Sequence, residues 1–155
     1  MSFAVTGLPL EDFRPLFGLS DEALAAKGIL RETAGPEGRY PCRITLEDAA
    51  PGDTLLLLSY EDHAAPTPYR NAYAIFVNER AAKSRRVVDA VPPVLRGRPI
   101  ALRVFDESGI KIDAELVLDD TVREAIVRHF DNPEVAYIHA HNASHGCFAA
   151  RIERA

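Results

Sequence analysis

The segment that most constrains the fold nearly ends the chain, at residues Val135–Arg154, and its pattern predicts a β-hairpin. Val135–Ala143 and Cys147–Glu153 are expected to be the strands, and Ser144-His145-Gly146 is expected to be the loop. A three-residue loop that ends in glycine favours a type I turn with a bulge, in which the glycine has a positive φ. This loop sets the register of the two strands.

In the predicted register, opposed residues share one face of the hairpin. The pairs are Ala143 with Cys147, His141 with Ala149, His139 with Arg151, and Ile138 with Ile152. The apolar face then carries Ile138, Ala140, Phe148, Ala150 and Ile152. The polar face carries Tyr137, His139, His141, Cys147, Arg151 and Glu153. A four-residue loop would mix the two sets, so the pattern favours the shorter loop.

Composition limits the class of protein. A length of 155 residues favours a single domain, 1–155, with a core that needs no disulfides. The net charge of −5 argues against nucleic acid as a partner. No apolar run approaches the roughly 20 residues that span a bilayer, so no membrane segment is expected. Cys42 and Cys147 show no CxxC spacing and no secretory leader precedes them, which favours free thiols in a cytoplasmic protein. Nothing in the pattern selects an oligomeric state.

The other segments predict an α+β fold with a largely antiparallel, hairpin-rich sheet and two or three short helices. Further strands are expected at Phe3–Thr6, Ile29–Thr33, Thr54–Tyr60, Ala72–Val77, Pro99–Phe105 and Ile110–Leu118. One short helix is expected between the N-cap Ser20 and Gly28. Another is expected to begin at Thr121-Val-Arg-Glu124, which has the spacing of a capping box. The basic segment Asn78–Asp89 is interpreted as a solvated loop or helix face, and Glu61–Asn71, with His63, as a loop.

His139 and His141 are the first candidate catalytic residues, because the i, i+2 spacing places both imidazoles on one side of a strand. Cys147 is expected on the same face, and Cys42 is a candidate fourth group. Such ligands suit zinc. Because the motif is short and the polar face of a hairpin is often exposed to solvent, we predict no metal and no cofactor, with zinc as the alternative.

Arg151 lies opposite His139 in the predicted register and is a candidate ligand-binding residue. A neighbouring cation disfavours protonation, so His139 is expected to be neutral near pH 7. Together they could bind a carboxylate or phosphate, although Arg151 could instead pair with Glu153.

Other candidates come from the loops and the thiols. Cys42 and Cys147 could act as nucleophiles beside cationic groups, but buried cysteines more often behave as small apolar residues. The additional candidate ligand-binding residues are Arg43, Tyr69, Arg70 and Asn142. In this register Asn142 lies on the opposite face, where it braces the turn.

Three groups of residues resemble one small bacterial family. They are Tyr40-Pro-Cys-Arg43 with Leu46-Glu-Asp-Ala49, Pro68-Tyr-Arg70 with Ile75-Phe-Val77, and Tyr137-Ile-His-Ala-His-Asn-Ala143 with Gly146-Cys-Phe148. The family is catalogued as domain of unknown function 1203, and the resemblance extends from Thr6 to Ala155. It departs at Tyr60-Glu-Asp-His63, where the family is expected to have histidine directly after glutamate. The resemblance implies a compact bacterial cytoplasmic domain and no particular reaction.

Two hypotheses follow for function. The first is a site on the polar face of the hairpin that binds or acts on a small anionic molecule. The second is a non-enzymatic protein-interaction domain whose histidine face contacts a partner. A concave pocket over His139 and His141 would favour the first, and a flat exposed face would favour the second. The sequence does not decide whether the protein is an enzyme.

Overall fold

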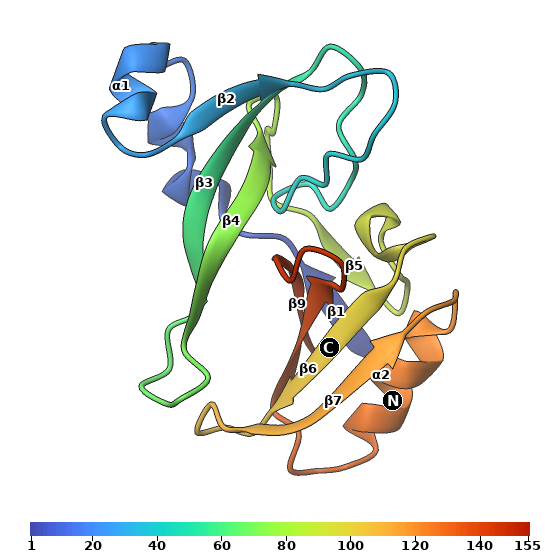
Figure 1. The fold of residues 1–155 in the computed structure, drawn as a ribbon. Coiled ribbons are helices and arrows are strands. Elements are labelled where there is room, and N and C mark those ends of the chain that lie inside the picture. Colours follow the sequence, from blue (N-terminus) through green and yellow to red (C-terminus); the bar gives the residue numbers. More distant parts are fainter.

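The closing hairpin forms the centre of the larger of two antiparallel sheets in the computed structural model, which describes residues 1–155 (Figure 1). The strand order of the six-stranded sheet is β5-β1-β9-β8-β6-β7. Its strands are β1 (Phe3–Thr6), β5 (Arg86–Val88), β6 (Ile100–Phe105), β7 (Lys111–Val117), β8 (Tyr137–Asn142) and β9 (Phe148–Arg154). The three-stranded sheet has the order β2-β3-β4, with β2 (Leu30–Thr33), β3 (Thr54–His63) and β4 (Asn71–Asn78).

The helices are short, and the α+β class predicted from the sequence is confirmed. The α-helices are α1 (Asp21–Ala25) and α2 (Val122–Phe130), and the 3-10 helices are η1 (Leu10–Asp12), η2 (Arg14–Leu16) and η3 (Pro93–Leu95). None of these helices has the length and hydrophobicity needed to cross a membrane.

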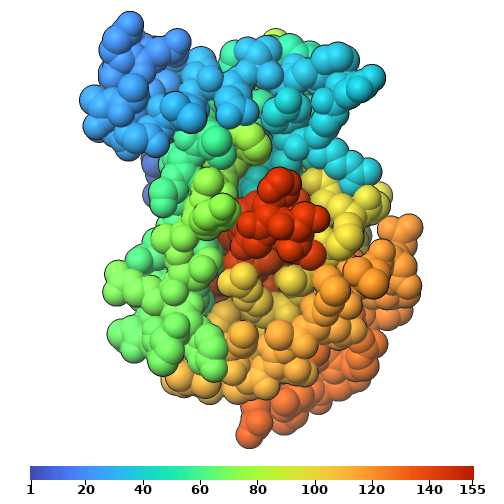
Figure 2. Space-filling model, viewed as in Figure 1, coloured from blue at the N-terminus to red at the C-terminus, as the bar shows by residue number.

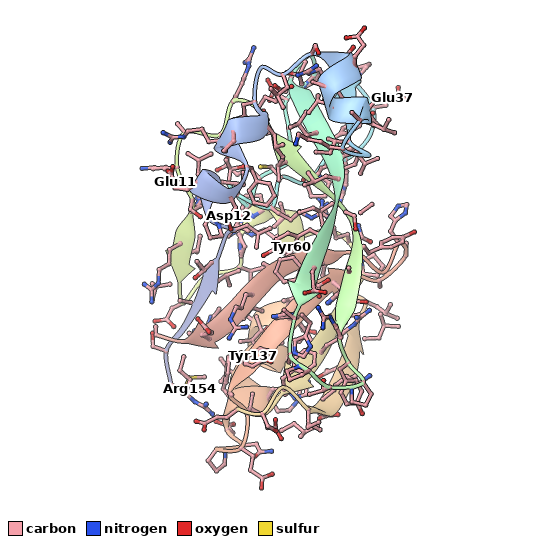
Figure 3. The ribbon with its side chains drawn as sticks, turned by 90° about the vertical axis from the view of Figure 1, so that its left-hand side faces the viewer. Glu11, Asp12, Glu37, Tyr60, Tyr137 and Arg154 are labelled. Carbon is pink, nitrogen blue, oxygen red and sulfur yellow. The ribbon has the colours of Figure 1, made fainter.

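The large sheet is covered on both faces at its centre. On one face, Ile138 and Ile152 of the hairpin pack in one buried cluster with Ile126 and Phe130 of α2. On the other face, Phe148 packs with residues of the small sheet such as Leu56 in a second buried cluster. In Figure 3 the strands of the small sheet pass in front of those of the large sheet, and Tyr60 of β3 lies above Tyr137 of β8. The polar face of the hairpin therefore lies between two sheets.

The hairpin register is correct in part. Ile138 pairs with Ile152 and His139 with Arg151, as predicted. The register then shifts, so that His141 pairs with Phe148 and not with Ala149. The amide of Asn142 donates to the carbonyl of Cys147 at 2.9 Å, which leaves a four-residue loop, 143–146. The predicted pairs Ala143–Cys147 and His141–Ala149 and the three-residue loop were wrong.

A β-bulge explains this error. One extra residue on β9 changes the alternation of side chains within the strand, so a four-residue loop no longer mixes apolar and polar sets. Ala149 packs in the apolar cluster with Ile138, while Phe148 lies on the histidine face. The prediction that Phe148 lies on the apolar face was wrong. Gly146 has φ +76°, which confirms the predicted left-handed conformation.

Three other expectations need correction. The segment Asn78–Asp89, interpreted as a solvated loop or helix face, contains the edge strand β5. Strand β3 continues to His63, so Asp62 and His63 lie on a strand and not in a loop. The hydroxyl of Thr121 donates to Asp119 at 2.5 Å and does not cap α2, so the capping box is absent. The Ser20 cap of α1 is present, because its Oγ accepts from the amide of Ala23 at 3.1 Å.

Candidate functional site

The polar residues of the hairpin divide into two groups, and the first contains the two histidines. His139 and His141 are each only 1% exposed, because strands β3 and β4 cover this face of the large sheet. The expectation that the histidine face is exposed to solvent was therefore wrong. The alternation along β8 does place both rings on one side, where each lies near the ring of Phe148, with centroid distances of 5.0 and 6.0 Å.

Asp62 of β3 faces both histidines across the interface between the sheets. Its Oδ2 atom lies 3.7 Å from Nδ1 of His139 and 3.7 Å from Nε2 of His141. These three atoms lie within 4.8 Å of one another, and each is buried without a hydrogen-bond partner. Asp62 is aimed at this point by a register shift between Glu61 and His63, which makes it the extra residue of a bulge.

The other polar atoms of the same side chains are held in place. Nδ2 of Asn71 donates to Oδ1 of Asp62 at 2.7 Å. Nδ1 of His141 lies 2.9 Å from the carbonyl oxygen of Gly146 and donates to it, since a carbonyl only accepts. The neutral His141 therefore presents the lone pair of Nε2 toward Asp62. Two acceptors face each other at this point.

Burial determines the charge of the cluster. It lowers the pKa of His141 to about 4. Burial also lowers the pKa of His139. The nearby cation of Arg151 lowers this pKa to a smaller extent, and Asp62 acts to raise it. Burial raises the pKa of Asp62, but the interactions with His139 and Asn71 outweigh it and leave that pKa below its ordinary value. At neutral pH the cluster is one carboxylate beside two neutral imidazoles.

Arg151 borders this cluster without completing it. Its Nη1 lies 3.4 Å from Nε2 of His139, while its Nε donates to Glu153 at 2.8 Å. The guanidinium also lies over the ring of Tyr137, with its Cζ 3.9 Å from the centroid. The predicted proximity of Arg151 to His139 is confirmed, and so is the alternative in which it pairs with Glu153.

The second group forms at the loop end of the hairpin, around Cys147. Nη2 of Arg43 donates to Sγ of Cys147 at 3.0 Å. The same guanidinium donates from Nε to the carbonyl of Phe148 at 2.7 Å and from Nη1 to that of Pro41 at 2.6 Å. Arg43 is 2% exposed, and burial lowers its pKa. Cys147 is thus held by Arg43 and is not among the residues that meet Asp62.

A cavity of about 620 Å³ opens beside Cys147. Its walls come from β4, the segments around residues 39–43 and 97–99, and the hairpin loop; Figure 2 shows the red loop against the yellow and cyan segments. The polar residues that line it include Arg39, Arg43, Arg98, Asn142 and His145. None of the lining residues is acidic. The expected residues Arg43, Asn142 and Cys147 come together here.

The remaining candidates lie elsewhere. Cys42 is fully buried in the core, and its Sγ accepts from the amide of Asn78 at 3.3 Å. Arg70 pairs with Glu61 at 2.9 Å on the surface. With Tyr69 it lines a separate pocket of about 200 Å³. Both cysteines are free thiols.

Sequence reasoning missed two residues of these sites, Asp62 and Arg98. The prolines of Glu61–Asn71 predict a loop that includes Asp62, although its strand continues beyond Tyr60. Arg98 stands between Gly97 and Pro99, where the turn residues gave no sign that its side chain is only 8% exposed. A bulge and a tertiary contact place these two residues, and neither has a local pattern.

Comparison with known proteins gives a family and no activity. A known family described as "Protein of unknown function (DUF1203)" matches residues 39–154. This range includes both groups of site residues but not strand β1 or helix α1. No curated protein matches the chain, and no solved structure does. Since the match covers most of the 155 residues, the chain belongs to the DUF1203 family of proteins of unknown function.

Proposed function

We propose that this domain binds a small organic anion, with a carboxylate or phosphate group, in the cavity beside Cys147. The observation that supports this proposal is the state of Arg43. Its guanidinium is almost fully buried, and its three polar partners are two carbonyls and a thiol, with no carboxylate among them. A guanidinium stays protonated in proteins, so this position holds a buried positive charge without a protein counter-ion.

An uncompensated buried charge is costly, and buried charges in proteins are usually paired. Carbonyl dipoles solvate part of the charge of Arg43. An oxyanion in the cavity would neutralise it and would accept hydrogen bonds that are stronger than those of neutral groups. The cation is therefore placed for a ligand of opposite charge.

Arg98 adds a second buried guanidinium to the cavity wall. One of its nitrogens pairs with Asp48, but its Nε is buried and has no hydrogen-bond partner. Arg39, at the edge, donates to the carbonyl of Gly97 at 2.7 Å. Three guanidinium groups thus line the cavity, and only one of them, that of Arg98, is paired with a carboxylate, that of Asp48. This excess of positive charge supports an anionic ligand.

The opposite wall suggests the rest of the ligand. Leu57, Ile75 and Phe76 of the small sheet line the cavity. Its volume of about 620 Å³ lies in the range of roughly 300–1,000 Å³ that is common for small-molecule sites. An anionic group bound to an apolar body would match both walls. This cavity lies beside Cys147 and not over His139 and His141, where the first hypothesis expected a pocket, and its concave shape supports a small molecule as the ligand here.

Calorimetric titration of the purified protein with phosphate, phenyl phosphate, acetate and benzoate tests the proposal. We expect a ligand with an apolar ring to bind more tightly than the corresponding small ion. Replacing Arg98 by Gln should weaken binding about tenfold or more, because a hydrogen bond to a charged group contributes roughly 1.5–3 kcal/mol.

Arg70→Gln is the matched control, since this arginine is exposed and lies outside the cavity. It should leave the dissociation constant unchanged. The phosphate and carboxylate series separates the two sources of negative charge. No binding by any of the four compounds at millimolar concentration, or equal weakening by Arg98→Gln and Arg70→Gln, would contradict the proposal.

A further inference from the structure

The cluster of Asp62, His139 and His141 lies outside the proposed anion site and contains buried polar atoms without hydrogen-bond partners. Buried polar atoms in native proteins nearly always have hydrogen-bond partners. Here Oδ2 of Asp62, Nδ1 of His139 and Nε2 of His141 are all buried without one, and all lie within 4.8 Å of one another. Three unpaired atoms that converge on one point indicate a missing group.

The hydrogen bonds around the cluster restrict what that group is. Nδ1 of His141 is committed as a donor to Gly146, so its Nε2 is an acceptor that faces the carboxylate of Asp62 at 3.7 Å. Oδ1 of Asp62 already accepts from Asn71, which leaves Oδ2 directed at the histidines. A cation between them satisfies both acceptors at once, and a divalent ion does so with two neutral imidazoles and one carboxylate.

We propose that Asp62, His139 and His141 bind a divalent transition-metal ion, with zinc as the first candidate, between the two sheets. Two imidazole nitrogens and one carboxylate oxygen form a ligand set that zinc accepts. Ligand atoms about 2.0–2.2 Å from a tetrahedral ion lie roughly 3.3–3.6 Å apart. Both separations between Asp62 and a histidine are 3.7 Å, so small movements of the side chains close the site.

The surroundings of His141 and Asp62 resemble those of built metal sites. Ligating histidines usually donate their other N–H to a carbonyl or carboxylate, as His141 does to Gly146. Asn71 fixes the carboxylate in the same way. When His139 binds through Nδ1, its Nε2 carries the proton and can no longer accept from Nη1 of Arg151, which lies 3.4 Å away. Arg151 then keeps its contacts with Glu153 and Tyr137.

The position of the site determines what the ion does. Asp62 comes from β3 and both histidines come from β8, so one ion joins the two sheets. Both histidines are 1% exposed, which shields the ion from solvent. Zinc should therefore stabilise the packing of the sheets, since an ion bound only in the folded state shifts the folding equilibrium.

The test uses the full chain, purified without a histidine tag or chelator. Elemental analysis should find about one zinc per chain, and removal of the metal by dipicolinate should lower the melting temperature. Addition of zinc chloride should restore that temperature. The variants Asp62→Asn, His139→Ala and His141→Ala should each lose most of the bound zinc and the response to added zinc.

Two controls protect the interpretation. His129→Ala removes a histidine of α2 that lies 2.8 Å from Glu115 and is not part of the cluster, and it should retain the zinc. Cobalt(II) in place of zinc gives a visible absorption that depends on its ligands. Asp62→Asn nearly preserves the size of the side chain, so a folded Asp62→Asn protein should still show a changed spectrum. Circular dichroism verifies folding of each variant.

A protein that binds no zinc and whose melting temperature does not respond to zinc chloride would overturn the proposal. So would zinc that is lost in His129→Ala and retained in Asp62→Asn. Neither result bears on the anion site, because its calorimetric test uses ligands and variants that do not touch this cluster.

Discussion

The Sγ atom of Cys147 lies 3.0 Å from Nη2 of Arg43, a contact that ties the hairpin loop to the segment before β3. It separates the polar groups of the hairpin into two sites. Cys147 lies beside the arginines at the loop end of the hairpin. His139 and His141 lie beside Asp62 between the two sheets. A sequence pattern that places all of these residues on one strand face does not reveal this division.

The two thiols should differ in their reactivity in the native protein. Cys147 is 8% exposed and lines the cavity, whereas Cys42 is fully buried in the core. Iodoacetamide should therefore modify Cys147 first, by at least about tenfold in rate, because alkylation needs access to sulfur. Peptide mass spectrometry over time gives both rates. Faster modification of Cys42 would mean that the cavity does not admit small molecules to Cys147.

Stability should decrease in acid in part through Glu79. Burial raises the pKa of Glu79, but the hydrogen bond and charge of Arg31 and the amide of Gly18 outweigh this and hold it below its ordinary value of 4.5. Because the folded-state pKa is the lower one, the stabilisation is present above about pH 4.5 and is lost as the pH falls through the folded-state pKa.

The variant Glu79→Gln measures this contribution. Arg31 donates to the carboxylate of Glu79 at 2.7 Å. Loss of this charged acceptor should lower the unfolding free energy by about 2 kcal/mol at pH 7. The difference from the unmodified protein should shrink toward pH 3, as urea titrations at several pH values will show. A constant difference between pH 7 and pH 3 would show that the carboxylate charge of Glu79 contributes nothing.

The sequence predicted the elements of the fold well because most of them are specified locally. Apolar alternation identified the closing hairpin, and Ser20 and Gly28 marked the ends of the first helix. Thr121 shows the limit of such rules, because its hydroxyl bonds to Asp119 in place of the helix amides. A capping motif offers a hydrogen bond, and a nearby carboxylate can take it.

The candidate site was predicted only in its hairpin half. The i, i+2 spacing brought His139 and His141 to one face, and the register placed Arg151 beside His139. The third residue of the cluster, Asp62, comes from another sheet through a bulge. Burial of the histidine face depends on how the two sheets pack, which involves contacts between distant segments. No local pattern records such contacts.

A β-carbon at the loop glycine should lower stability although there is open space around it. Gly146 has φ +76°, and a β-carbon there would meet no atom within 4 Å. Any loss of stability in Gly146→Ala is therefore due to the backbone conformation, and we expect about 1 kcal/mol. Gly35→Ala is the control, because no positive φ is required at that position. Equal urea midpoints for the two variants would contradict the role of the positive φ.

Phe148 should be the most sensitive single contact between the sheets. The bulge turns its ring toward the small sheet, where it is 2% exposed and lies 6.3 Å from the ring of Tyr60, between centroids. Phe148→Ala should lower the unfolding free energy by about 3–5 kcal/mol, since it removes a buried ring and leaves a cavity. Tyr73→Ala, which removes a ring that is 55% exposed on β4, should cost less than about 1 kcal/mol. Urea denaturation of both variants compares the two costs, and a loss below about 1 kcal/mol for Phe148→Ala would mean that this ring does not hold the sheets together.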